Sequence, residues 1–316
     1  MDRTVFTAKP AAETEALNAE IIAKLSALPD QWAFAPHVVR QRRAEGLGPF
    51  PLAPKAPHAF EVTAEGATGT VPLRVIAPQT RPARGIYLHF HGGGWTLGSR
   101  DFQDPMLESI AEKTGLAAIS VGYRLAPEHP YPAALHDIRT ALDGYVLTAG
   151  RDRFGDMLAV GGESAGAHLS VLAMLDCRER LGAMPFRAAN LIAGCYDLAL
   201  SPSARNWGSL KLVLNTRDID TFAGLFAPSF MDRRDPKISP LYADLSGLPP
   251  ALFTVGTRDP LLDDTLFMAA RWAAAGNHAE RFIVPGGCHV FQYFDIPATA
   301  ESHRCSAGFL NAVLGE

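Results

Sequence analysis

Met157-Leu158-Ala159-Val160-Gly161-Gly162-Glu163-Ser164-Ala165-Gly166 is the stretch that decides the fold. Its first four residues form an apolar run that predicts a buried strand, and three leucines at helical spacing follow its end. A sharp turn from strand to helix therefore falls at Ser164. Glycines on both sides remove Cβ atoms that would collide there, and the hydroxyl projects above the sheet at the positive end of a helix. The alternative, a glycine-rich turn with a solvated serine, leaves the flanking periodicity unexplained.

Short apolar runs alternate with helical periodicity on both sides of this turn. The predicted strands are Ile86–Phe90, Ala117–Tyr123, Met157–Val160, Ala189–Ala193, Ala251–Val255 and Arg281–Val284. Before them, His58–Thr63 and Val71–Ala77 are typical of an antiparallel hairpin. Such alternation indicates an α/β fold: a mostly parallel, twisted sheet flanked by helices.

Two segments have no obvious place in such a sheet. Residues 11–28 predict an amphipathic helix, and a linker rich in glycine and proline follows over residues 46–57. Between residues 201 and 237 the alternation lapses while the sequence stays apolar, which predicts a helical insertion. The expected division is a helical cap from residues 1–47 and 201–235 over a catalytic core from residues 48–200 and 236–316.

Composition excludes several classes of protein. The chain of 316 residues has 29 Lys+Arg against 33 Asp+Glu, a net charge of −4 that disfavours nucleic acid as a partner. Its four cysteines show no C-x-x-C spacing, which predicts reduced core thiols and no metal site. The N-terminus has no apolar signal core, and no run of about 18 apolar residues occurs, so we expect a soluble cytoplasmic protein without a membrane span.

A second glycine-rich motif follows the predicted strand Ile86–Phe90. The motif is His91-Gly92-Gly93-Gly94-Trp95, placed at the carboxyl end of the sheet, where ligands of open α/β folds bind. Acyl transfer needs two or three backbone N–H groups aimed at a developing oxyanion, and we expect the amides of Gly93, Gly94 and Ala165 to supply them. A phosphate cradle is disfavoured because neither G-x-G-x-x-G nor G-x-x-x-x-G-K occurs.

A serine hydroxyl becomes a nucleophile only when a base takes its proton. One of the ten histidines should therefore reach Ser164 and be oriented by a carboxylate. Asp259 and His289 follow the two last predicted strands, on loops at the same edge of the sheet as Ser164. This gives the chain order Ser, Asp, His.

Other candidates for these roles fit less well. Asp263 and Asp264 are expected to be solvated or dipole-complementing acids at the start of a helix. His168 lies one helical turn after the serine and points along the helix, which favours a structural role, and His91 could stiffen the glycine loop by a hydrogen bond. Cys288, beside His289, lacks a helix N-terminus to activate it, so we expect a buried thiol.

Together these motifs resemble the hormone-sensitive-lipase-like branch of the α/β-hydrolases, the bacterial family IV esterases. The matching stretches are His91-Gly92-Gly93-Gly94-Trp95, Tyr123–Ala134, Gly162-Glu163-Ser164-Ala165-Gly166, and Asp259-Pro260-Leu261 with His289 downstream. The resemblance implies Ser164 as nucleophile, His289 as general base and acid, and Asp259 as the orienting acid. It also implies the oxyanion hole and the cap described above. Glu163 and Ala167 stand where the family often has Asp or Thr and a further Gly, which leaves the acyl-chain and alcohol preference open.

The sequence therefore predicts a cofactor-free serine carboxylesterase for small-molecule esters with short to medium acyl chains. Trp95, Tyr196, Trp207 and Phe222 are expected to wall an apolar substrate pocket, although Trp207 and Phe222 could equally be cap core. The same residues would serve a lactone, an arylformamide or another amide. A ligand receptor without activity, on a hydrolase scaffold, is the alternative from another class.

The oligomeric state has two interpretations at this stage. The resemblance implies a possible homodimer through the last strand and helix. The C-terminal apolar run, with Cys305, Phe309, Leu310 and Val313, could present such a face, but covering the sheet explains it equally well.

Overall fold

The computed structural model describes residues 4–67 and 69–315, and within them eight strands form one sheet. The strands are β1 (Phe60–Gly66), β2 (Gly69–Ile76), β3 (Gly85–Phe90), β4 (Leu116–Val121), β5 (Met157–Glu163), β6 (Ala188–Ile192), β7 (Ala251–Gly256) and β8 (Ala279–Val284). They are ordered β1-β2-β4-β3-β5-β6-β7-β8. The β1–β2 hairpin is antiparallel, as is its junction with β4, and all other neighbours are parallel. Every predicted strand is confirmed, with boundaries that move by at most three residues.

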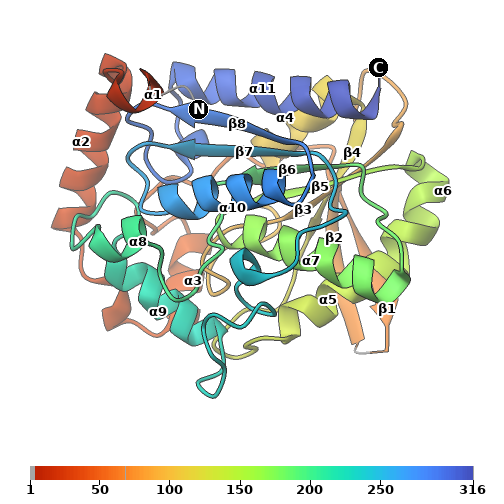
Figure 1. The fold of residues 1–316 in the computed structure, drawn as a ribbon, viewed down its shortest axis with the longest axis horizontal. Coiled ribbons are helices and arrows are strands. Elements are labelled where there is room, and N and C mark those ends of the chain that lie inside the picture. The colour runs from red at the N-terminus through yellow and green to blue at the C-terminus, as the bar shows by residue number, and fades with distance from the viewer. Residues whose placement is uncertain (1–3, 68, 316) are drawn as a thin grey trace.

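Helices cover both faces of this sheet (Figure 1). The longer ones are α2 (Ala12–Ala27), α3 (Pro36–Ala44), α4 (Asp104–Thr114), α5 (Ala133–Ala141), α7 (Ala165–Leu181), α9 (Thr216–Phe226), α10 (Leu262–Ala274) and α11 (Pro297–Leu314). The shorter ones are α1 (Thr4–Thr7), α6 (Arg151–Phe154), α8 (Pro202–Asn206), η1 (Gln31–Ala33), η3 (Pro240–Tyr242) and η4 (Phe291–Tyr293), while η2 (Leu142–Gly150) is a π-helix that continues α5. Helices α4 and α11 pack on one face, and α5, α7 and α10 on the other.

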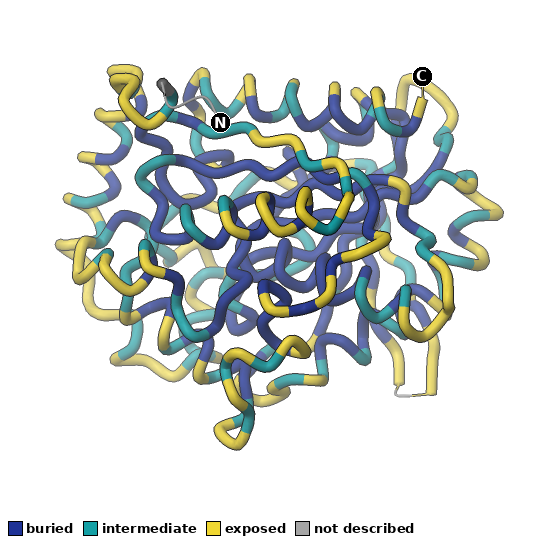
Figure 2. Tube along the Cα trace, in the orientation of Figure 1, coloured by how far each residue is buried: buried dark blue, intermediate teal, exposed yellow. Residues whose placement is uncertain are grey.

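Strand β3 shows why the central strands are continuously apolar. All its residues are buried, and alternate side chains belong to different cores: Ile86, Leu88 and Phe90 to one, Tyr87 to the other. A strand covered on both faces is therefore apolar at nearly every position, and its one polar side chain, His89, is hydrogen-bonded. Figure 2 shows the resulting distribution, with buried strands at the centre and exposed residues in outer helix turns and loops.

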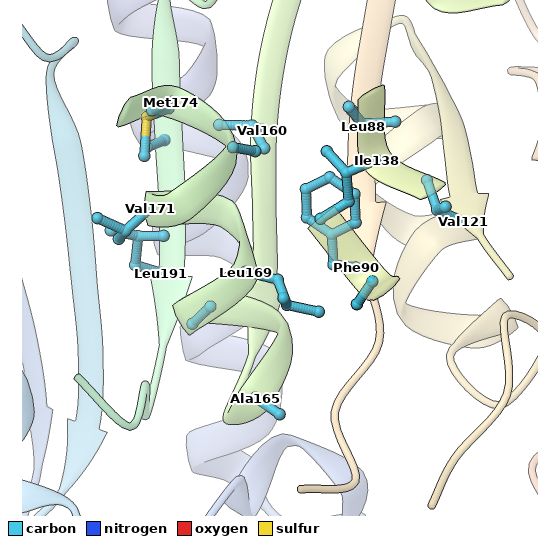
Figure 3. Close-up of a cluster of buried hydrophobic side chains, with 14 of the residues drawn as sticks. Leu88, Phe90, Val121, Ile138, Val160, Ala165, Leu169, Val171, Met174 and Leu191 are labelled. Carbon is cyan, nitrogen blue, oxygen red and sulfur yellow. The ribbon is translucent and has the colours of Figure 1, made fainter. Parts of the chain in front are cut away.

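Helix α7 packs along the middle of the sheet, directly after β5. Ala165, Leu169, Val171 and Met174 lie among side chains of β3, β5 and β6 (Figure 3). Because this helix is buried along its first ten residues, the turn that precedes it is held by the core rather than by solvent-exposed loop contacts.

The segments predicted to lie outside the sheet contact one another. Helix α2 packs through Ile21 on a cluster with Leu212 and Phe291. In η1, the indole of Trp32 donates to Asp218 of α9 at 2.6 Å, and its ring lies edge-on to Phe222 at 4.9 Å. Figure 1 shows α2, α3, α8 and α9 gathered at one end of the molecule. The predicted N-terminal helix and helical insertion are therefore present, and they pack together.

The C-terminal apolar run covers the sheet within this chain. Phe309 and Leu310 of α11 are buried in the same core as Tyr87. The four cysteines are free thiols, as predicted, with three of them buried and Cys305 half-buried.

Candidate active site

The turn at Ser164 is as sharp as its glycines predict. Ser164 has φ 56° and ψ −118°, and its amide donates to the carbonyl of Ile192 at 2.8 Å. A Cβ added at Gly162 or Gly166 would lie 2.3 or 1.8 Å from the carbonyl oxygen of Phe90. Side chains at these two positions would push α7 away from β3, so glycine is required by close packing.

Three polar side chains meet above this turn, from the loops after β5, β7 and β8. The imidazole Nε2 of His289 lies 3.0 Å from Ser164 Oγ. Its Nδ1 lies 3.0 and 3.1 Å from the two carboxylate oxygens of Asp259. The amide of Leu261 donates to Asp259 at 2.8 Å and fixes the carboxylate. All three side chains are buried, with Ser164 8% exposed, His289 4% and Asp259 1%.

The glycine loop lies beside Ser164, and its three amides differ in whether a protein group accepts their hydrogen bond. Gly92 N–H donates to Glu163 Oε1 at 2.6 Å, while the carbonyl of Gly93 accepts from Leu97 at 2.7 Å. Gly93 and Gly94 have φ of 117° and 60°, values that L side chains rarely adopt. Within the described residues neither of these two glycines donates its amide to a protein acceptor. Ala165 begins α7, where helix amides have no intrahelical partner.

Glu163 connects the turn to this loop through a buried network. Its Oε1 also accepts from the Tyr293 hydroxyl at 3.0 Å, and its Oε2 lies 2.9 Å from His89 Nε2. His89 Nδ1 in turn lies 2.9 Å from Ser120 Oγ. Tyr293 is 46% exposed, but desolvation at its hydroxyl raises its pKa well above the usual value, and the Glu163 carboxylate raises it further. The hydroxyl therefore stays a donor. Sequence reasoning missed Tyr293, because nothing in its local pattern points to residue 163.

Two other histidines near the site have structural partners. His91 Nδ1 lies 2.8 Å from the carbonyl of Gly92, so it stiffens the glycine loop as predicted. His168 accepts from the indole of Trp95 at 3.0 Å and lies 2.8 Å from the carbonyl of Ile238. Burial lowers the pKa of both imidazoles to about 4, which keeps them neutral.

The prediction that Asp264 is solvated was wrong. Its carboxylate is fully buried and accepts from the amides of Tyr196 and Asp197 at 2.6 and 2.8 Å. Burial raises its pKa to about 7. Only Asp263, half-buried at the start of α10, is near solvent, and it accepts from the amide of Ser203. Cys288 is a buried thiol, as predicted, and burial raises its pKa to about 12.

A small apolar cavity of about 20 Å³ lies against Ser164. Its lining residues are Gly94, Trp95, Ser164, Ala165, Cys195, Leu214, Ile219, Phe222 and Leu261. Of the four predicted wall residues, Trp95 and Phe222 line it, whereas Tyr196 is buried in the core and Trp207 packs with the cluster under α2. Four lining residues escaped sequence reasoning: Cys195, Leu214, Ile219 and Leu261. Only the fold brings them to the serine.

Metal-ligand clusters and membrane-spanning helices are both absent from the described residues. In residues 4–67 and 69–315 there is no group of three or more His, Cys, Asp or Glu side chains that could hold a metal ion. In the same ranges no helix combines the length and the apolar character that crossing a membrane requires.

Comparison with known proteins agrees with this geometry. A family model described as an alpha/beta hydrolase fold matches residues 87–293. The chain belongs to this family. The α/β-hydrolase chain is 35% identical over 225 residues to the carboxylic ester hydrolase LipN of Mycobacterium tuberculosis, a match that covers 68% of this chain but only 59% of LipN. It is 34% identical over 244 residues to the carboxylesterase NlhH of the same organism, covering 73% and 75% of the two chains.

Solved structures extend the likeness to nearly the whole hydrolase chain. A hyperthermophilic esterase from the archaeon Pyrobaculum calidifontis superimposes with a TM-score of 0.85 at 26% identity, covering 96% of this chain and 99% of that one. The resemblance predicted from the motifs and the predicted α/β-hydrolase fold are both confirmed.

Proposed function

We propose that this hydrolase is a serine carboxylesterase in which Ser164, His289 and Asp259 form the catalytic triad. The observation that carries the proposal is the contact chain from Ser164 Oγ through His289 to Asp259, with each step at 3.0 Å. Ser164 attacks the ester carbonyl while His289 takes its proton and then gives it to the leaving alcohol. Asp259 holds the imidazole in the tautomer that this requires. Water, activated by His289, then releases the acid from the acyl-enzyme.

The oxyanion formed in each step would be held by the amides of Gly93, Gly94 and Ala165. Two of these amides have no acceptor in the described residues, and the third begins a helix whose positive end faces the developing charge. Loss of one such donor typically costs about 2.7–4 kcal/mol of transition-state stabilisation. Glu163 supports this arrangement because it occupies the Gly92 amide and fixes the loop beside the serine.

The cavity beside Ser164 supports a short acyl group, at the small end of the predicted range. Its volume of about 20 Å³ leaves room for little more than a methyl group. Phe222 closes it, since its ring carbons would lie 2.3 Å from a Cβ placed on Gly94. We therefore propose acetyl esters as the preferred substrates.

The proposal extends to the organisation of the chain. Residues 1–47 and 201–235 would form a cap over a core of residues 48–200 and 236–316. The contacts of Trp32 with Asp218 and Phe222 support this division. A homodimer through the outer edge of β8 is part of the same proposal, because β8 ends the sheet on one side. Four free thiols are consistent with the reducing cytoplasm.

Hydrolysis of p-nitrophenyl esters from acetate to palmitate tests the activity. We expect the highest kcat/KM for acetate, and a fall of at least about 10⁴-fold in kcat for Ser164→Ala. Ser170→Ala, which removes a buried hydroxyl from the same helix, is the matched control and should keep its activity. A phosphonate label should map to Ser164 by mass spectrometry.

The same experiment separates the alternatives. A chain that hydrolyses no ester but still reacts with phosphonate at Ser164 would be a hydrolase of lactones or amides. A chain that does neither would be a receptor, and the proposal would be wrong.

A further inference from the structure

A second cavity, of about 400 Å³, lies between α3, the linker around Lys55 and the loop of residues 98–102. That loop directly follows the glycine loop, and Gly98 is so close to it that a Cβ there would lie 2.3 Å from the carbonyl of Gly92. The cavity therefore adjoins the outer side of the proposed oxyanion hole, whereas the small apolar cavity lies against Ser164 itself.

The lining of this second cavity is cationic. Three of its residues carry a positive charge, namely Arg40, Arg43 and Lys55, against one carboxylate, Asp101. Lys55 is paired with Asp101, and Arg40 donates to Glu128 at 2.6 Å and to the carbonyl of Thr96 at 3.0 Å. These two cations are already neutralised by protein groups.

Arg43 is different, because its guanidinium lacks an ionic partner. Within residues 4–67 and 69–315 its Nε is buried without a hydrogen-bond acceptor, and its Nη2 makes one long contact of 3.5 Å with Gln31 Oε1. Arg43 as a whole is half-buried, and an unpaired guanidinium in the wall of a cavity can take an anion as its partner. Burial lowers the pKa of Arg43, although Tyr293 and Asp218 raise it.

Tyr293 and Asp218, the two groups that raise the pKa of Arg43, are both hydrogen-bonded to residues near the proposed catalytic centre. Tyr293 donates to Glu163, the residue before the nucleophile. Asp218 accepts from Trp32, whose ring packs on Phe222 above Gly94. The second cavity therefore borders the side chains that support the turn at Ser164 and the ring that limits the apolar cavity.

We propose that this cavity binds a carboxylate, with Arg43 as its charged donor, and that the natural ester carries this carboxylate on its alcohol part. A planar guanidinium matches a carboxylate in shape and charge. The inference rests on the proposed function: the acyl group occupies the apolar cavity, and the alcohol part extends into the cationic one. The same chemistry would also hold a free organic acid, and the experiment distinguishes the two sources.

The test compares esters that differ only in charge. The substrates are 4-acetoxybutanoate and 6-acetoxyhexanoate, each measured against its own carboxamide by acetate release. In the wild type we expect kcat/KM to favour the carboxylate by about tenfold or more for at least one chain length, as a charge-assisted hydrogen bond would provide. In Arg43→Gln the ratio of kcat/KM for the carboxylate to kcat/KM for the carboxamide should fall toward one. Arg43→Lys should restore part of this preference.

Arg42→Gln is the matched control. Arg42 is the preceding cation on α3, it is exposed, and it lies over the ring of Phe34 outside the cavity lining. Its ratio should equal that of the wild type. Because the ratio is taken within one variant, a general loss of activity does not imitate the expected result.

Saturation-transfer NMR with hexanoate, and with hexanamide as the neutral probe, adds a readout that needs no turnover. Charge preference in hydrolysis assigns the carboxylate to the substrate. Saturable binding of hexanoate that Arg43→Gln abolishes, without any preference in hydrolysis, assigns the cavity to a free acid. The proposal would be overturned if the wild type showed no charge preference in hydrolysis and bound hexanoate no better than hexanamide. Both measurements need only the wild type, so this outcome stands even if Arg43→Gln fails to fold. Failure of the wild type to hydrolyse p-nitrophenyl acetate would instead reject the proposed function.

Discussion

Gly166 shows how one absent Cβ controls the geometry at Ser164. The 1.8 Å that would separate a Cβ here from the carbonyl oxygen of Phe90 is far below any real contact. Gly308, in the interior of α11, has nothing within 4 Å of the same position. Close packing therefore requires glycine at position 166 but not at position 308. Substitution of each by alanine should have opposite effects on stability.

We expect Gly166→Ala to destabilise the protein by about 1–3 kcal/mol or more, because overpacking displaces α7 from β3. Gly308→Ala should stabilise it by about 0.5–1 kcal/mol, because alanine is the better helix former. Urea denaturation followed by circular dichroism measures both. Equal effects of the two substitutions would show that the contact with Phe90 does not set the requirement for glycine.

The local chemistry at this scale was predictable from the sequence, and the long-range partners were not. Glycines on either side of Ser164 are a signal carried by neighbouring residues. The partners of Glu163 come from residues 89, 92 and 293, and the contact groups of Arg43 from residues 31, 218 and 293. Such contacts depend on packing between distant segments, which no local pattern encodes.

At the scale of single elements, α9 sets the size of the apolar cavity. The helix begins with a capping box in which Asn215 and Asp218 each bond the other's backbone amide. It presents Phe222 to Gly94, and Trp32 lies edge-on to the same ring at 4.9 Å. The position of Phe222 is thus fixed by the capped helix that carries it and by the contact with Trp32 from a distant segment.

Phe222→Ala should enlarge the cavity and move the best p-nitrophenyl ester from acetate toward butyrate or hexanoate. The reason is that a removed aromatic ring leaves space that a longer acyl chain can fill. Steady-state kcat/KM values across the ester series measure the shift. Phe267→Ala, an exposed phenylalanine on α10, should leave the optimum unchanged. An unchanged optimum in Phe222→Ala would show that another wall limits the acyl group.

Elements were predictable where apolar periodicity is regular. The strands and α2 follow their patterns closely, since two-sided burial and helical stripes leave clear signals. Leu135, Ile138 and Leu142 lie at the regular spacing of one helical stripe, yet the structure changes from α5 to a π-helix at Leu142. The helix predicted over residues 11–28 ends at Ala27, so Leu28 lies beyond it and is 41% exposed.

At the scale of the whole molecule, buried titratable groups give stability opposite dependences on pH. Burial raises the pKa of Asp264 from 3.8 to about 7, so its contribution to stability is full below pH 3.8 and is lost as the pH rises to about 7. Burial lowers the pKa of His91 and His168 from 6.5 to about 4. Their contributions are full above pH 6.5 and are lost as the pH falls toward 4.

Asp264→Asn should remove one side of this balance. The amide oxygen can still accept from Tyr196 and Asp197, but it does not titrate. Relative to the wild type, the variant should gain free energy of unfolding as the pH rises from 4 to 7, by about 4 kcal/mol at most. Urea titrations at several pH values measure the difference. Asp263→Asn is the control, and identical pH profiles for wild type and Asp264→Asn would contradict the assignment.

The contact between α2 and the loop after β8 has a consequence for synthesis on the ribosome. Asn18 donates to the carbonyl of Gly286, 268 residues later in the chain. At about 5–20 residues per second, α2 emerges roughly 10–50 s before its partner exists. Ser164 likewise emerges long before Asp259 and His289. In the proposed mechanism, Ser164 therefore has neither its base nor its orienting acid until translation has nearly finished.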